Sequence, residues 1–199
     1  PDHWSEGYLK HLGEDERLLA QAVSTPSFME VMTNFFETPD EGMNRGKALE
    51  FLLVLGEYET TKSIVNTFTD VTSGHIRGYM IEFAGENGLV NGYPDGTFQP
   101  ERTVNRVEAI KMSMFFFGIE VEELYGDDLL DFYYLEDNPF TDVDIEAWYA
   151  PYLLFAYSIG VVSGYGDGTF GPGNEVTFAE FMKISTLISE VDDAVELAS

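Results

Sequence analysis

The protein chain has 199 residues with 36 acidic and 10 basic side chains, and its formal net charge at pH 7 is −26. Such an acidic surface argues against nucleic acid and anionic membranes as partners, because both are bound through Lys and Arg. The sequence has no cysteine, which excludes disulfides and Cys-based catalytic or zinc sites. No apolar run reaches the roughly 18 residues of a membrane-spanning helix, so we expect no membrane insertion.

The first predicted unit, residues 1–62, is a divergent copy of a helix–loop–helix unit that recurs twice later in the chain. Its second helix is expected to begin after Asn44, a typical N-cap residue, with Arg45 at the first helical position. Lys47 stands where a capping box would have Glu, so the box is incomplete. Residues 19–42 lack the turn that the other units contain, which indicates an insertion.

The second predicted unit, residues 63–126, has a first helix over 76–87 and then the turn GYPDGTF at 92–98. The Asp-Gly pair in this turn is typical of a tight reversal that needs a conformation disfavoured by side chains. The second helix is expected to begin after Asn105, and Glu108 completes a capping box. These signals predict helix, loop and helix in succession.

The third predicted unit, residues 127–199, begins with an acidic connector and then repeats the second unit without a gap. Its turn GYGDGTF, at 164–170, lies 72 positions after the first turn. Thr177 and Glu180 again form a capping box, but Phe178 stands where the earlier units have Arg. A gap-free repeat of this kind indicates duplication. The apolar stripes of the second helices predict that these helices meet at the centre, because one unit cannot bury its stripe alone.

Three elements recur together in the second and third units: an FTDV motif, the glycine-rich turn ending in Phe and Pro, and a helix start written NRVE or TFAE. This combination resembles the S-layer homology family. The first unit is similar only through HWSEGY and MNRGK. The resemblance implies a mainly α fold, in which three helix–loop–helix units form a pseudo-threefold assembly around a central three-helix bundle. It also implies a non-catalytic module whose grooves between units hold cell-wall polysaccharide, often a polymer bearing ketal-linked pyruvate.

Arg45 and Arg106 are the first candidates for ligand binding. A cation at the first position of a helix opposes the helix dipole, and a bound anion would reverse this unfavourable effect. A guanidinium beside free backbone N–H groups suits a carboxylate such as that of a pyruvate ketal. The alternative is that each arginine pairs with one of the many acidic side chains. Because Phe178 replaces arginine in the third unit, we expect at most two anion pockets, with the third groove inactive or apolar.

Trp4 and Trp148 are expected on the first helix of their units, where an indole either stacks on a sugar ring or packs in the core. Capping alone explains the glutamates of the two capping boxes without a ligand. The remaining candidate ligand-binding residues are two glycines that begin the repeated turns and two helix caps: Gly92, Gly164, Asn44 and Asn105.

Calcium binding and catalysis find little support in the sequence. When Gly96 or Gly168 is aligned with the sixth position of an EF-hand loop, Arg102 or Asn174 stands where the loop needs its bidentate glutamate. The three histidines show no metal-ligand spacing, and no nucleophile motif or phosphate-binding loop is present. We therefore expect no metal, no cofactor and no enzymatic activity.

The leading hypothesis is an extracellular cell-surface module that binds cell-wall polysaccharide and so attaches an S-layer or other surface protein. The alternative is a degenerate scaffold of the same family that acts in protein–protein assembly with other S-layer or envelope proteins. The missing turn of the first unit, the missing arginine of the third and the acidic surface favour this alternative. The sequence leaves both hypotheses open.

Overall fold

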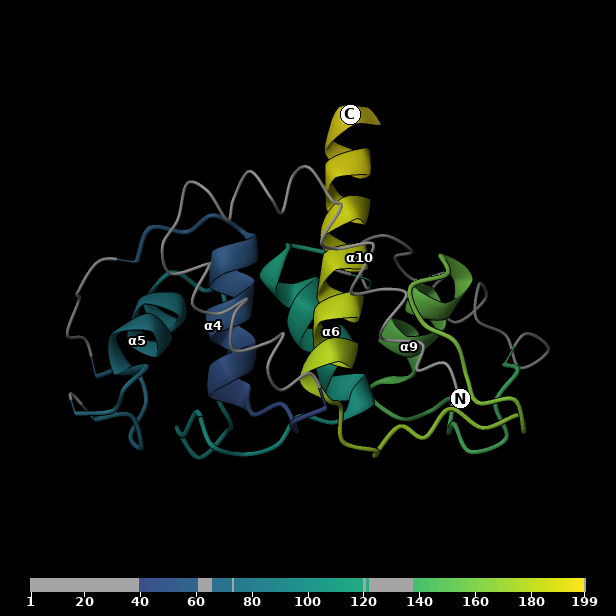
Figure 1. The fold of residues 1–199 in the computed structure, drawn as a ribbon, viewed down its shortest axis with the longest axis horizontal. Helices are drawn as coiled ribbons and strands as arrows, with labels where there is room; N and C mark the ends of the chain where they lie inside the picture. Colours follow the sequence, from purple (N-terminus) through teal and green to yellow (C-terminus); the bar gives the residue numbers. More distant parts are fainter. Residues whose placement is uncertain (1–39, 61–65, 73, 120, 122–137, 199) are drawn as a thin grey trace.

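The computed structural model describes residues 40–60, 66–72, 74–119, 121 and 138–198. Within these ranges the fold is mainly helical, as expected, and pairing between extended segments is limited to isolated bridges. The helices, labelled as in Figure 1, are α4 (Arg45–Leu55), α5 (Gly78–Glu86), α6 (Arg106–Phe116), α9 (Ala150–Ser158) and α10 (Phe178–Ala198). No helix in the described part is long and apolar enough to cross a membrane.

The helices interleave across the predicted unit boundaries. In Figure 1, α4, α6 and α10 occupy the middle of the molecule, and α5 and α9 flank them on opposite sides. Helix α10 packs against α4 and α6, α5 packs against α4, and α9 packs against α6. The first helix of one unit therefore packs on the second helix of the unit before it. This exchange brings side chains from different units into common grooves.

A cycle of backbone hydrogen bonds joins the segments that precede the three central helices. The N–H of Met43 donates to the carbonyl of Val176 at 3.0 Å, that of Val176 to Val104 at 2.9 Å, and that of Val104 to Met43 at 2.9 Å. All three side chains are buried, so the cycle lies within the core. The pseudo-threefold assembly of complete units and the boundaries 1–62, 63–126 and 127–199 stay predictions, since residues 1–39 lie outside the described part.

The expected caps start the central helices. Asn105 accepts a hydrogen bond from the N–H of Glu108 at 2.9 Å, and the Glu108 carboxylate accepts from the N–H of Asn105 at 3.1 Å. Thr177 and Glu180 make the same reciprocal pair. Asn44 caps α4 by accepting from the N–H of residue 47 at 2.8 Å. Arg45 and Arg106 therefore occupy first helical positions, as predicted.

The aspartate of each FTDV motif holds the repeated turn in place. Asp70 accepts hydrogen bonds from the backbone N–H groups of Phe98 and Gln99, both at 2.7 Å. Asp142 does the same for residues 170 and 171, both at 2.8 Å. The turn glycines have positive φ angles, +81° at Gly96 and +86° at Gly168, as expected. The turn is therefore a structural element, fixed by hydrogen bonds from its backbone to these aspartates.

The flanking helices begin later than expected. We placed Trp148 on the first helix of its unit and began the helix of the second unit at residue 76, but α9 starts at Ala150 and α5 at Gly78. Trp148 therefore lies in the turn before α9. Pro151, in the first turn of α9, explains this start, because proline has no N–H to donate and is tolerated only near a helix N-terminus.

Candidate functional site

A groove in the described part of the chain lies where three predicted units meet, and we call it the Arg45 groove. Its volume is about 540 Å³. Its walls are the start of α4, the loop at residues 90–94, the outer face of α6 and Trp148. The turn of the second unit thus faces an arginine that belongs to the first.

Arg45 lies between two aromatic rings, with no carboxylate partner among the described residues. Its Nε donates to the carbonyl of Phe98 at 2.8 Å, and its Nη2 donates to the carbonyl of Asn91 at 3.2 Å. The guanidinium carbon lies 4.8 Å from the ring centroid of Tyr93 and 4.7 Å from that of Phe98. Burial lowers the pKa of Arg45, yet arginine remains charged in proteins. Within the described ranges, the alternative of pairing with an acidic side chain is not observed for this arginine.

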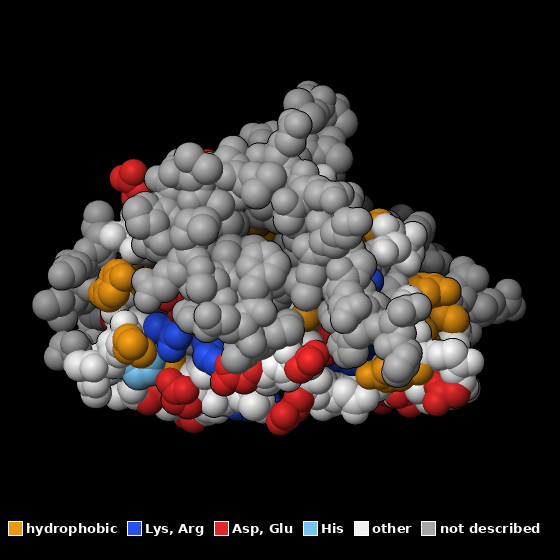
Figure 2. Space-filling model, in the orientation of Figure 1, with side chains coloured by type: hydrophobic (Ala, Val, Ile, Leu, Met, Phe, Trp, Pro, Cys, Tyr) orange, Lys and Arg blue, Asp and Glu red, His pale blue; other side chains and the backbone are white. Residues whose placement is uncertain are grey.

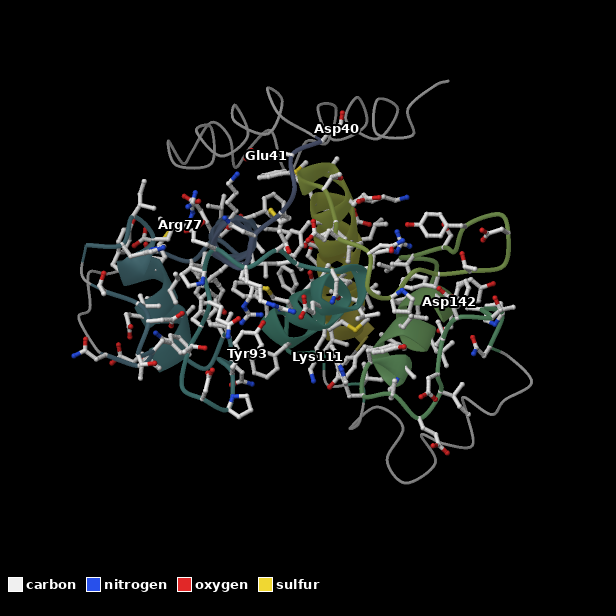
Figure 3. All side chains as sticks on the ribbon, turned by 90° about the horizontal axis from the view of Figure 1, so that it is seen from below. Asp40, Glu41, Arg77, Tyr93, Lys111 and Asp142 are labelled. Atoms are coloured by element: carbon white, nitrogen blue, oxygen red, sulfur yellow. The ribbon has the colours of Figure 1, made fainter. Side chains whose placement is uncertain are left out.

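Lys111 is a second cation in the Arg45 groove, and sequence analysis did not single it out. Its Nζ lies 5.0 Å from the ring centroid of Trp148 and 4.7 Å from that of Tyr152, and no ion pair involves it in the described part. Trp148 is 55% exposed, which suits contact with a ligand better than core packing. Figure 3 shows Lys111 and Tyr93 on the same side of the molecule. The missed signal was a lysine recurring 72 positions apart, at 111 and 183, in a chain poor in bases.

The acidic side chain of the Arg45 groove is neutralised within the protein. Arg102 Nη1 lies 2.6 Å from Glu108 Oε1 and also donates to the hydroxyl of Tyr93. The hydrogen bond to Glu108 raises the pKa of Arg102, against a smaller lowering by burial. With Glu108 paired in this way, the positive charges of Arg45 and Lys111 are left for a ligand.

A smaller groove of about 260 Å³ lies at the start of α6, and we call it the Arg106 groove. It is lined by residues 161–165 and by Glu180, Lys183 and Ile184 of α10. Arg106 Nη2 donates to the carbonyl of Ser163 at 2.9 Å, and the guanidinium lies over the rings of Tyr165 and Phe170 at 5.2 Å and 4.3 Å. Like Arg45, Arg106 pairs with no carboxylate in the described ranges.

Phe178, which holds the corresponding position on α10, lies in the core. It is buried, and its ring meets that of Phe51 edge-on at 6.1 Å between centroids. Phe178 thus offers an apolar contact where the other helices offer a cation. The third groove, expected to be inactive or apolar, stays a prediction because the segment that would face Phe178 lies outside the described residues. Trp4 also lies outside them.

The other predicted site residues combine structural roles with groove positions. Gly92 lines the Arg45 groove and Gly164 the Arg106 groove. A Cβ on Gly92 would lie 2.6 Å from the Phe68 ring, and one on Gly164 would collide with the equivalent phenylalanine, so both positions require glycine. The side-chain oxygens of Asn44 and Asn105 cap their helices. A direct ligand role for these four residues stays a prediction.

The described residues show no cluster of three or more His, Asp or Glu side chains that could hold a metal ion. The geometry instead offers guanidinium and ammonium groups beside aromatic rings. Such an arrangement is suited chemically to an anionic or hydroxyl-rich ligand, through charge-assisted hydrogen bonds and stacking.

Two segments of the chain match a known protein family. Residues 67–110 and 139–182 each match the S-layer homology domain. Two segments of the chain are therefore similar to the S-layer homology domain. Each match spans the FTDV motif, the repeated turn and the start of a central helix. The presence of three tandem units stays a prediction, because no match covers the first predicted unit.

Several bacterial surface proteins are similar to this chain. Cell surface glycoprotein 1 of Acetivibrio thermocellus is 30% identical over 71% of the chain, and the cellulosome-anchoring protein of the same organism is also 30% identical over 71%. S-layer protein EA1 of Bacillus anthracis is 24% identical over 72% of the chain. The aligned regions cover 6%, 31% and 15% of these three proteins, so the chain spans a minor part of their length.

The domain matches and these relatives together support a cell-surface location and a cell-surface anchoring module. An S-layer homology domain is generally a non-catalytic anchoring module, in line with the sequence-based expectation. The absence of enzymatic activity in the whole chain remains a prediction.

Proposed function

We propose that this chain anchors a surface protein to the cell envelope by binding cell-wall polysaccharide in the Arg45 and Arg106 grooves. The observation that carries the proposal is the state of the two arginines. In a chain with a net charge of −26, neither has a carboxylate partner in the described part, and each stands at the first position of a helix.

The chemistry of the grooves supports an anionic polymer with exposed sugar faces. Figure 2 shows acidic side chains along the lower edge of the molecule, and the net charge of −26 would repel a negative polymer from the protein as a whole. It would be attracted only where cations are unpaired, which restricts binding to the grooves. A pyruvate ketal combines a carboxylate with a methyl group, and the Arg45 groove combines Arg45 and Lys111 with apolar walls including Met112 and Phe115.

Co-sedimentation with purified cell-wall sacculi tests the proposal. The full chain should sediment with intact sacculi and remain in solution when the non-peptidoglycan polymer has been removed. A variant carrying both Arg45→Ala and Arg106→Ala, checked for an unchanged circular dichroism spectrum, should remain in solution with both preparations.

Sedimentation with sacculi of both kinds, or undiminished sedimentation of the double variant, would contradict the proposal. In the second case the protein-assembly alternative would become the better hypothesis. Sacculi stripped of their own surface proteins serve as the control that separates the two outcomes.

A further inference from the structure

The Arg45 and Arg106 grooves share a scaffold but differ in the state of their acidic side chain. Glu108 and Glu180 are equivalent residues, each one turn into a central helix, and each uses Oε2 to complete a capping box. In the Arg45 groove, Glu108 Oε1 is paired with Arg102 at 2.6 Å. In the Arg106 groove, Glu180 Oε1 has no hydrogen-bond or ion-pair partner among the described residues.

One substitution between the repeats accounts for this difference. Asn174 stands in the third unit where the second unit has Arg102. Both side chains donate to the tyrosine hydroxyl of the repeated turn, Arg102 to Tyr93 and Asn174 to Tyr165 at 3.2 Å. Asparagine has the same local role but is shorter and uncharged, so it does not neutralise the adjacent glutamate.

The Arg106 groove also has an unsatisfied donor. Arg106 Nε is buried and has no hydrogen-bond partner among the described residues, whereas Nε of Arg45 donates to the carbonyl of Phe98. The groove therefore contains an unused carboxylate oxygen on Glu180 beside the guanidinium of Arg106, and Lys183 is also among its lining residues. A sugar hydroxyl can donate to the first and accept from the second, whereas a carboxylate ligand would face the negative charge of Glu180.

We propose that the two grooves take chemically different parts of one polysaccharide, the Arg45 groove an anionic sugar and the Arg106 groove an uncharged, hydroxyl-bearing sugar. This inference rests on the proposed function, because it assumes that both grooves bind sugar. It assigns the specificity to the Arg102–Glu108 pair in one groove and to unpaired Glu180 with Asn174 in the other.

Single-groove proteins provide the test. Arg106→Ala leaves the Arg45 groove to be measured alone, and Arg45→Ala leaves the Arg106 groove. Each protein is titrated calorimetrically with monovalent wall-polysaccharide fragments bearing ketal-linked pyruvate, and with the same fragments after mild acid has removed the ketal. The Arg106→Ala protein should prefer the pyruvylated fragment by about tenfold or more, as expected of hydrogen bonds to charged groups. The Arg45→Ala protein should bind the depyruvylated fragment at least as tightly as the charged one.

Two variants of the Arg106 groove then test the assigned residues. Glu180→Gln keeps the capping box, because Gln also serves at that position, and removes the negative charge. Asn174→Arg restores the pairing seen in the second unit. In the Arg45→Ala background each should shift preference toward the pyruvylated fragment by several-fold.

The outcomes separate this inference from the proposed function. The inference is overturned if both single-groove proteins prefer the pyruvylated fragment equally, or if Glu180→Gln and Asn174→Arg leave the preference unchanged. If the unmodified chain binds neither fragment, the proposed function itself fails. Melting temperatures of all variants identify any that lose binding by unfolding.

Discussion

The outer faces of α6 and α4 carry charged residues at equivalent positions but in opposite order. Counted from the N-cap of each helix, Glu108 and Lys111 of α6 correspond to Lys47 and Glu50 of α4. On α6 the lysine meets the aromatic rings of Trp148 and residue 152 and makes no ion pair in the described part. It is therefore available to a ligand.

On α4 both charges are used within the protein. Lys47 Nζ lies 2.9 Å from Glu41, and Glu50 lies 2.6 Å from Nε of Arg77. The place that Trp148 takes beside α6 corresponds in the second unit to Ile76, which is 78% exposed. The comparison teaches that a repeated position does not by itself make a binding groove. An unpaired cation beside an exposed indole distinguishes the α6 face from the α4 face.

The largest effect is expected from Phe178→Ala, at the helix start that has no cation. Removing a buried phenylalanine that packs on Phe51 should lower the free energy of unfolding by about 3–5 kcal/mol, measured by urea denaturation. Binding of wall fragments per folded molecule should not change, because the ring lies in the core. Lost binding at unchanged stability would show that Phe178 contacts ligand directly.

Arg45→Ala should have the next largest effect. The change is measured in the Arg106→Ala background, where binding reports on the Arg45 groove alone. Affinity for the pyruvylated fragment should fall about 10- to 100-fold, the loss expected of hydrogen bonds to a charged group. Lys47→Ala is the matched control on the same helix, because that lysine is already paired. Equal losses in the two variants would contradict the distinction between paired and unpaired cations.

Lys111→Met tests the α6 face with its packing kept. Methionine preserves the apolar stem beside Trp148 but removes the charge, and affinity for the pyruvylated fragment should fall about two- to fivefold, as for a partly exposed charge. Titration calorimetry measures the change. Glu50→Gln on α4 should leave the affinity unaltered, and a comparable loss there would mean that the α4 face also binds the polymer.

The smallest effect is expected in the pH dependence of stability, and it arises in the two repeated turns, one of which lines each groove. A hydrogen bond from the hydroxyl of Thr169 and a second from its N–H lower the pKa of Asp167, and Thr97 does the same for Asp95. A lowered pKa in the folded state stabilises the fold above the unfolded pKa, about 3.9 for aspartate, and this stability is lost as pH falls below it.

The melting temperature should therefore be level near neutral pH and begin to fall near pH 4. Asp167→Asn together with Asp95→Asn should make this fall shallower. An unchanged profile in the double variant would assign the acid sensitivity to other carboxylates.

The sequence by itself determined the local features of this protein. The starts of α4, α6 and α10 could be predicted because each depends on a cap that bonds within three residues, as Asn105 does with Glu108. The positive φ of Gly96 and Gly168 could be predicted because an Asp-Gly turn imposes it locally. Arg45 and Arg106 could be nominated as candidates because the N-caps place them at the ends of helix dipoles.

Only the tertiary structure decided how these features combine into grooves. Arg45 bonds to the carbonyl of Phe98, 53 residues away, and Trp148 meets Lys111 because α9 packs on α6. Whether a charged side chain finds a partner also depends on distant residues, since Glu50 is paired only because Arg77 approaches α4. In a chain with so many acids, local patterns do not reveal which cations remain unpaired. The packing of helices from neighbouring units decides it, because ion pairs form only between groups that the fold brings within a few ångströms.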